Sequence, residues 1–247
     1  AIWLTPFYIS PQVDNGYDVA NYTAIDPAYG TLDDFDELVA RAHARGIRII
    51  TDLVMNHTSD QHPWFQASRT DPTGPYGDFY VWGDDPERYP EIRVIFTDVE
   101  TSNWTWDEKR GQYYFHRFYS HQPDLNYDNP AVQEEVFKIL SFWMDKGLDG
   151  LRLDAIAYLF ERDGLGGESL PETIEFVEKI RSFMDATIRM PCSSRRPTSR
   201  RPKPCNSTAR ASASTWSSTS RLCRGCTKHW RLPTPPRSTP SSTNCPP

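Results

Sequence analysis

All 33 acidic residues of this 247-residue chain lie before residue 191, and residues 191–247 contain no Val, Ile, Phe, Tyr or Met. A segment with so little apolar surface cannot bury enough of it to offset the entropy lost on ordering. We therefore expect residues 191–247 to be disordered on their own. The part of the chain that can build a hydrophobic core ends near residue 190, so a fold has to be sought in residues 1–190.

The composition of residues 191–247 has three interpretations. Their 11 Lys and Arg residues are typical of a basic tail that binds nucleic acid or anionic surfaces. The pair Cys223 and Cys226 has the spacing of half a metal knuckle, but no second pair with this spacing accompanies it. The third interpretation is a shifted reading frame of a GC-rich gene. Such a frame yields a composition rich in Ser, Pro, Arg, Thr and Cys.

A back-translation favours the shifted frame. With suitable codons for residues 187–200 and one base added after codon 187, the segment reads Thr-Tyr-Thr-Asp-Ala-Val-Leu-Leu-Ala-Glu-Ala-Asn-Gln-Pro. This is an apolar strand that ends in a carboxylate, and the Glu falls across codons 195 and 196. We therefore interpret residues 191–247 as a frameshift product, in which case the five Cys residues say nothing about redox compartment.

Strand-like and helix-like segments alternate along residues 1–190. Short apolar runs predict buried strands at three places: residues 1–8, 47–54 and 150–155. Apolar residues at helical spacing predict three helices: residues 31–45 with Thr31 as N-cap, a helix with Pro130 in its first turn, and residues 171–184. This alternation is typical of an α/β fold with a parallel sheet built from βα units.

The connection between the second strand and the second helix is unusually long. It exceeds 70 residues, far more than an ordinary βα connection, and it is dense in Trp, Tyr and Phe. We expect a functional insertion here. Aromatic faces beside many carboxylates suit stacking on sugar rings, although the core of a compact subdomain would use them too.

Polar residues gather where two of the predicted strands end. Asp52, Asn56 and His57 close one strand, and Arg152 and Asp154 close another. Side chains two residues apart on a strand point to the same face, so Arg152 and Asp154 should lie together. An Arg beside an Asp keeps the carboxylate ionised and oriented, which suits a nucleophile. An Arg–Asp pair that only supports the sheet would have the same spacing.

Four sequence blocks carry a family resemblance. They are Asp14-Asn-Gly-Tyr-Asp-Val19, Asp52-Leu-Val-Met-Asn-His57, Gln122-Pro-Asp-Leu-Asn126 and Gly150-Leu-Arg-Leu-Asp154. In this order and at this spacing, they resemble the α-amylase family, glycoside hydrolase family 13, across essentially all of residues 1–190. The resemblance implies a partial (β/α)8 barrel with an inserted B domain, in which the chain begins at the second barrel strand. The implied division is given by four ranges: 1–55 for barrel strands 2 and 3 and helix 2, 56–128 for the B domain, 129–190 for barrel helices 3 to 4, and 191–247 for the off-family tail.

The resemblance also implies catalytic roles. Asp154 would be the nucleophile of a retaining mechanism and Arg152 would orient it, while Asp14, Tyr17 and His57 would line the pocket for the glucose ring. The acid/base Glu would close the next strand, where the added base restores a Glu at codons 195 and 196. The third carboxylate of the family would lie beyond residue 247. We therefore predict that the chain as written is inactive.

Within the family, three further segments resemble the members that isomerise maltose to trehalose. They are residues 78–82, 95–107 and 111–116. Such an enzyme needs a closed pocket that retains the freed glucose and excludes water. Two alternatives remain: an α-glucosidase or oligo-1,6-glucosidase, which lets water attack, and a catalytically dead binding fragment.

A structural Ca²⁺ ion is implied by the same resemblance. Its oxygen ligands would come from Asn56, Asp124, the carbonyls of Tyr158 and Leu159, and Glu161. The alternative is that Asn56 and Asp124 only hydrogen-bond the insertion to the barrel. We expect no organic cofactor, a disaccharide as the ligand, and neither nucleic acid nor membrane as a partner. A chain that opens on Ala-Ile-Trp-Leu, without a basic leader or a long apolar stretch, is expected to be cytoplasmic.

Overall fold

The computed structural model of the protein describes residues 1–188. The expected disordered, frameshifted tail at 191–247 and the Glu at codons 195 and 196 lie outside the described residues. The four-range domain division therefore stays a prediction, and its last range has no structural description.

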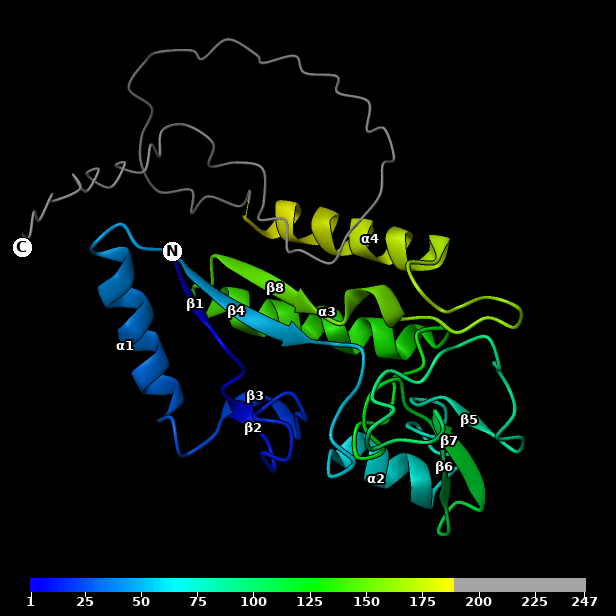
Figure 1. The fold of residues 1–247 in the computed structure, drawn as a ribbon. Coiled ribbons are helices and arrows are strands. Elements are labelled where there is room, and N and C mark those ends of the chain that lie inside the picture. The colour runs from blue at the N-terminus through cyan, green and yellow to red at the C-terminus, as the bar shows by residue number, and fades with distance from the viewer. Residues whose placement is uncertain (189–247) are drawn as a thin grey trace, which may run out of the picture. The chain divides into compact units, whose positions relative to one another are not determined.

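A parallel three-stranded sheet carries the site. Its strands are β1 (Ile2–Leu4), β4 (Ile49–Val54) and β8 (Gly150–Asp154), in the order β1-β4-β8. The register pairs Asp52 with Arg152 and Val54 with Asp154. The arrowheads of β4 and β8 in Figure 1 point the same way, towards the segment that follows β4. Residues that follow these two strands are therefore brought to one edge of the sheet.

The single strand predicted over residues 1–8 is wrong in its extent. The parallel strand β1 ends at Leu4, and a separate strand β2 (Tyr8–Ile9) pairs antiparallel with β3 (Asn21–Ile25). Pro6 lies between the two short strands, and proline has no backbone N–H to donate to a sheet. The chain therefore leaves the parallel sheet at this point, and residues 10–20 form the loop between β2 and β3.

The three predicted helices form where their sequence signals placed them. In α1 (Leu32–His43), the Asp34 N–H donates to Thr31 Oγ1 and the Thr31 N–H donates to the Asp34 carboxylate, a capping box. Helix α3 (Pro130–Asp145) starts at Pro130 after the N-cap Asn129. Apolar residues at helical spacing form its buried face: Val132, Val136, Ile139, Leu140 and Trp143. Helix α4 (Pro171–Ile188) runs four residues past its predicted end.

The long connection after β4 has secondary structure of its own. It contains α2 (Pro63–Thr70) and an antiparallel sheet in the order β5-β7-β6, formed by β5 (Trp82–Gly83), β6 (Trp104–Asp107) and β7 (Gln112–Phe115). Many of its aromatic side chains pack on one another: Phe65 stacks on Trp82 with ring centroids 5.5 Å apart, and Tyr89 stacks on Trp104. Many of these aromatic side chains therefore form the core of the insertion, which was the alternative to stacking on sugar rings.

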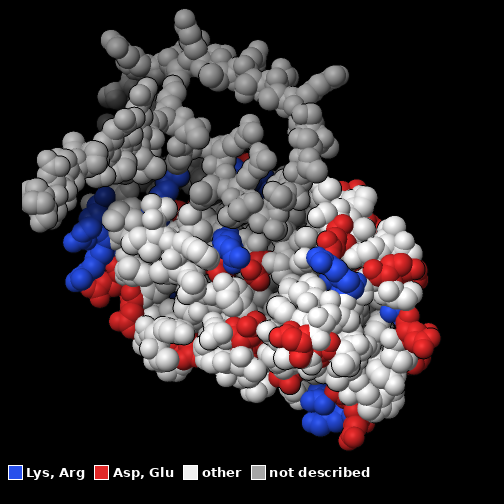
Figure 2. Space-filling view, in the orientation of Figure 1, with Lys and Arg blue, Asp and Glu red and all other residues white. Residues whose placement is uncertain are grey.

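Acidic and basic side chains are interspersed on the face of residues 1–188 drawn in Figure 2, and the basic ones form separate small groups. Among the described residues, no helix combines the length and the hydropathy that a bilayer crossing requires.

Candidate active site

Asp154 and Arg152 lie on the same face of β8, as their spacing predicts. Arg152 Nη1 lies 2.9 Å from Asp154 Oδ1 and donates a hydrogen bond to Asp52 Oδ1 at 2.8 Å. One guanidinium therefore bridges two carboxylates from neighbouring strands. The Asp154 side chain is 21% exposed, so it is accessible while it is held in place.

Asp52 is the centre of this arrangement. Its side chain is fully buried on β4, and three donors converge on its carboxylate. Trp3 Nε1 donates to Oδ1 at 3.2 Å, and the Tyr17 hydroxyl donates to Oδ2 at 3.0 Å, in addition to the bond from Arg152. The Arg152 guanidinium also lies 5.3 Å from the centroid of the Trp3 ring. Arg152 is thus oriented by groups from all three parallel strands.

The expected sugar-binding residues lie beside this network. His57 Nε2 lies 3.2 Å from the carbonyl oxygen of Tyr17, and the Asp14 carboxylate accepts a hydrogen bond from Gln122 Nε2 at 2.8 Å. The Tyr17 N–H also donates to the carbonyl of Asp14. The loop between β2 and β3 therefore delivers Asp14 and Tyr17, and the segment after β4 delivers His57.

Burial controls the charge states here. It raises the pKa of Asp154, and the ion pair with Arg152 opposes that rise. Arg152 therefore favours the ionised form of Asp154, as expected. Its effect on the pKa is smaller than the opposite effect of burial. Burial also lowers the pKa of His57 to about 4, and it raises the pKa of Tyr17 to about 12 with help from the nearby Asp52 charge. His57 and Tyr17 are therefore neutral hydrogen-bonding groups near pH 7.

The structure brings the predicted residues Asp14, Tyr17, His57, Arg152 and Asp154 into one region. Sequence reasoning missed two positioning groups, Asp52 and Gln122. Each lies in a motif that was identified, but neither was assigned a role. A charged residue inside an otherwise apolar, doubly buried strand was the available signal for Asp52, because a buried carboxylate requires partners.

The expected calcium ligands Asn56 and Asp124 are brought together by backbone pairing. His57 and Asp124 form an antiparallel bridge, and the Leu125 N–H donates to the carbonyl of Asn56 at 2.9 Å. Asn56 Oδ1 and Asp124 Oδ2 are both buried and lack a hydrogen-bond partner among the described residues. Two orphaned buried acceptors at one place suit a cation that accepts oxygen ligands.

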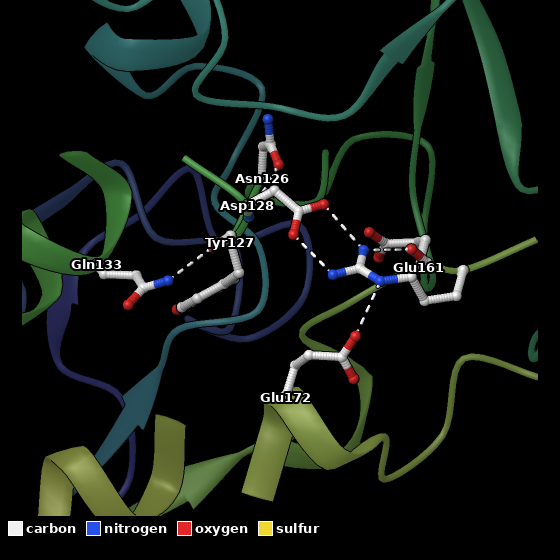
Figure 3. Close-up of polar contacts among 7 residues, drawn as sticks. Asn126, Tyr127, Asp128, Gln133, Glu161 and Glu172 are labelled. Atoms are coloured by element: carbon white, nitrogen blue, oxygen red, sulfur yellow. Dashed lines mark hydrogen bonds and ion pairs between the residues drawn. The ribbon is translucent and has the colours of Figure 1, made fainter. Parts of the chain in front are cut away.

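Glu161 lies in the same environment. Burial and the nearby Asp124 charge raise its pKa well above the usual range, and burial raises the pKa of Asp124 to about 8. The next residue, Arg162, joins this segment to Asp128 and Glu172, whose carboxylates point towards one guanidinium beside Glu161 in Figure 3. Its Nη1 and Nη2 donate to the two carboxylate oxygens of Asp128 at 2.9 and 2.7 Å, and its Nε donates to Glu172 at 3.0 Å.

The remaining expected ligands are the carbonyls of Tyr158, which ends the short helix η1 (Ile156–Tyr158), and Leu159, which caps it. The donor set of two carboxylates, one amide and two carbonyls is all oxygen, and the side chains that would supply it fit Ca²⁺. Among residues 1–188 there is no group of three His, Cys, Asp or Glu side chains that could bind a metal by themselves, so the amide and the carbonyls would be needed.

Comparison with known proteins gives a consistent result. The family model described as alpha amylase, catalytic domain, matches residues 1–193. A trehalose synthase of Pimelobacter sp. (strain R48) is 61% identical over 184 residues, which cover 74% of this chain and 32% of that protein. The trehalose-6-phosphate hydrolase of Escherichia coli (strain K12) is 59% identical over 158 residues, which cover 63% of this chain and 28% of that protein.

A solved structure, the crystal structure of an alpha-glucosyl transfer enzyme, superposes with a TM-score of 0.70 at 37% identity and covers 76% of this chain and 40% of that one. The predicted fold class, part of a (β/α)8 barrel, is confirmed by the family match and by this superposition. The chain spans about a third of the length of the relatives it matches.

Proposed function

This chain belongs to the alpha-amylase catalytic-domain family, and we propose that the enzyme that carries it isomerises maltose to trehalose through a glucosyl intermediate on Asp154. The observation that carries the proposal is the accessible Asp154 carboxylate held by Arg152, in a chain 61% identical to a trehalose synthase. The buried Asp52 fixes the guanidinium and therefore the direction of the nucleophile.

In the first step, an Asp154 carboxylate oxygen attacks the anomeric carbon of the non-reducing glucose of maltose. The bond from that carbon to the oxygen of the second glucose breaks, and a carboxylic acid gives its proton to this oxygen. Asp14, Tyr17 and His57 hold the glucose ring by hydrogen bonds. Because burial lowers the pKa of His57 to about 4, its imidazole stays neutral and does not repel the positive charge that develops on the sugar.

In the second step, the freed glucose turns within the closed pocket and its anomeric hydroxyl attacks the glucosyl–Asp154 ester. The carboxylate that gave its proton in the first step takes the proton of this hydroxyl, and Asp154 leaves as a carboxylate. The product is the α-1,1 disaccharide. If water enters instead, the same step releases a second glucose, so the product depends on how well the pocket excludes water.

We propose that the acid/base is the Glu at codons 195 and 196 of the restored frame, which lies outside the described residues. The five glutamates that follow β8 within residues 155–188 are all engaged or placed elsewhere. Glu161 is buried beside Asp124, Glu168 and Glu172 pair with arginines, and Glu175 and Glu178 are exposed on α4. The 247-residue chain as written should therefore not convert maltose, whereas the enzyme with the restored frame should.

Resequencing codons 185–200 on both strands checks the added base. Conversion of maltose by the chain as written, at the rate of the full-length enzyme, would contradict the assignment.

We propose that Ca²⁺ binds Asn56, Asp124, Glu161 and the carbonyls of Tyr158 and Leu159. The ion would compensate two buried carboxylates and join the segments after β4 and β8. Its contribution is structural, because none of these groups is among those assigned to the glucose ring or to the reacting carbon.

A hydrolase is the second candidate, because the chain is also 59% identical to a trehalose-6-phosphate hydrolase. The deciding experiment incubates the full-length enzyme with maltose and quantifies trehalose and glucose by anion-exchange chromatography. Trehalose as the main product supports the isomerase, and glucose as the main product supports the hydrolase. Asp154→Asn is the control, since loss of the nucleophile should abolish both products.

A further inference from the structure

Arg117 is a buried cation that the mechanism above does not use. It follows β7, near the end of the long insertion, and its side chain is only 2% exposed. Burying a guanidinium costs free energy unless carboxylates and carbonyls surround it. The partners of Arg117 therefore indicate its role.

The partners of Arg117 lie on the segment between β8 and α4. Arg117 Nη2 lies 2.9 Å from Glu168 Oε1, and its two terminal nitrogens lie 3.4 and 3.5 Å from the carbonyl oxygen of Gly166. The guanidinium also lies over the Tyr158 ring, 4.7 Å from its centroid. One side chain of the insertion therefore contacts three groups of the segment that follows the nucleophile strand.

The backbone at Gly167 permits this close approach. Its φ is +63°, in the region that favours glycine, and a Cβ there would lie 3.4 Å from Arg117 Nη1 and 2.8 Å from Ile92 Cδ1. A side chain at this position would push the loop away from both residues. The loop is thus shaped to lie against Arg117.

The residue after Arg117 faces the sugar site. The Phe118 ring lies 5.2 Å from the imidazole of His57 and packs edge-on against Tyr158 at 5.6 Å. Its backbone is therefore anchored, through Arg117, to the same segment that its ring contacts. A shift of this anchor would move the ring away from His57 and open a path for water.

We propose that the Arg117–Glu168 contact is a positioning device that keeps Phe118 against His57 and so sets the fraction of glucosyl intermediate that is transferred to glucose rather than to water. This inference rests on the proposed function. Arg117 and Glu168 act through Phe118, and neither touches the reacting atoms.

A matched pair of variants separates this role from general ion pairing. Glu168 also pairs with Arg93 at 3.0 Å, but the Arg93 side chain is 69% exposed, and exposed pairs contribute little. Glu168→Gln removes the charge that compensates buried Arg117, whereas Arg93→Gln removes only the exposed partner. Both substitutions are made in the full-length enzyme.

The first measurement is the ratio of glucose to trehalose formed from maltose. We expect Glu168→Gln to raise this ratio several-fold, up to about tenfold, which corresponds to a change of about 1.4 kcal/mol between two competing barriers. Arg93→Gln should leave the ratio unchanged. An unchanged ratio in Glu168→Gln, or an equal rise in Arg93→Gln, overturns the proposal.

The second measurement is amide hydrogen exchange of residues 116–122 and 159–170. Glu168→Gln should exchange faster than the wild type in both segments, and unchanged protection overturns the proposal whatever the products are. If Glu168→Gln does not fold, Arg117→Met combined with Glu168→Gln removes the unpaired charge and should show the same raised ratio. A folded double variant with a wild-type ratio overturns the proposal. If the wild type makes only glucose, the proposed function is wrong. Hydrogen exchange then still tests whether the Arg117–Glu168 contact holds the two segments together.

Discussion

At the scale of single residues, the buried Asp52 carboxylate is the group on which the site depends most. It accepts hydrogen bonds from Trp3, Tyr17 and Arg152, which come from two other strands and a loop. A carboxylate with three donors is a rigid acceptor, because each donor restricts its rotation. The proposed nucleophile Asp154 is held by the same guanidinium, which Asp52 fixes.

Asp52→Asn keeps the shape of the side chain but removes the charge that fixes Arg152. We expect kcat on maltose to fall about 100-fold, because a small misplacement of a reacting group costs a factor of this size. KM should change much less, since Asp14 and His57 still bind the ring. Steady-state kinetics of the full-length enzyme checks this, with Trp3→Phe as a control that removes only one neutral donor. A kcat close to that of the wild type would show that Asp52 does not orient the nucleophile.

Local sequence patterns identified the residues of the candidate site better than they identified the contacts between those residues. Arg152 and Asp154 follow from the period of a strand, which is a local property. The contacts of Asp52 join residues 35 to 100 positions apart in the chain, and such long-range partners follow only from the order and register of the strands. Gln122 is a similar case, because it reaches Asp14 from the far end of the insertion.

At the scale of secondary-structure elements, caps and breakers explain both the correct and the wrong predictions. Thr31 and Pro130 are strong start signals, and both helices begin where these residues predict. The strand over residues 1–8 was predicted too long, because its apolar pattern continues through Pro6 while its hydrogen bonding does not. Helix α2 was not predicted, and it begins at an unusual cap, His62.

The cap of α2 predicts a pH dependence of stability. His62 Nδ1 accepts a hydrogen bond from the Trp64 N–H, and burial lowers the pKa of His62 from 6.5 to about 3. Between these values the unfolded chain binds a proton that the folded chain excludes, so the free energy of unfolding falls as the pH falls from 6.5 towards 3. The slope from this one group is at most about 1.4 kcal/mol per pH unit.

His62→Asn tests this dependence, because asparagine also caps helices but does not titrate. Urea unfolding at several pH values between 4 and 7 should give a shallower loss of stability for the variant than for the wild type. Parallel curves would show that folding does not lower the pKa of His62.

At the scale of the whole described molecule, the insertion contacts the barrel at several places around the proposed sugar site. Gln122 bonds to Asp14, the Tyr22 hydroxyl donates to the carbonyl of His57, and Arg117 contacts the segment after β8. The family resemblance and the α/β pattern predicted a barrel with an insertion. They could not predict these ties, because each depends on how two segments that are far apart in the sequence meet in the fold.

Calcium is expected to stabilise this junction. At a free Ca²⁺ concentration of about 100 times Kd, binding adds about 2.7 kcal/mol, which raises the Tm of the full-length enzyme by a few degrees. Thermal unfolding of the full-length enzyme with Ca²⁺ and with a chelator measures the shift. Asp124→Ala should remove most of the Tm shift. Glu135→Gln is the control: it removes only an ion pair with Lys138 on α3, and the Tm shift should stay. Equal Tm values with Ca²⁺ and with the chelator would exclude the metal.

The register that sets Asp52 opposite Arg152 also determines which kinds of mutation this region tolerates. Alternate side chains of β4 and β8 point to opposite faces, so deleting or inserting one residue in either strand would turn each later side chain of that strand to the wrong face. A conservative substitution changes one contact, whereas a single-codon deletion within residues 49–51 would separate Asp52 from Arg152. Inheritable variation in these two strands should therefore consist of substitutions, and length changes should be confined to the loops.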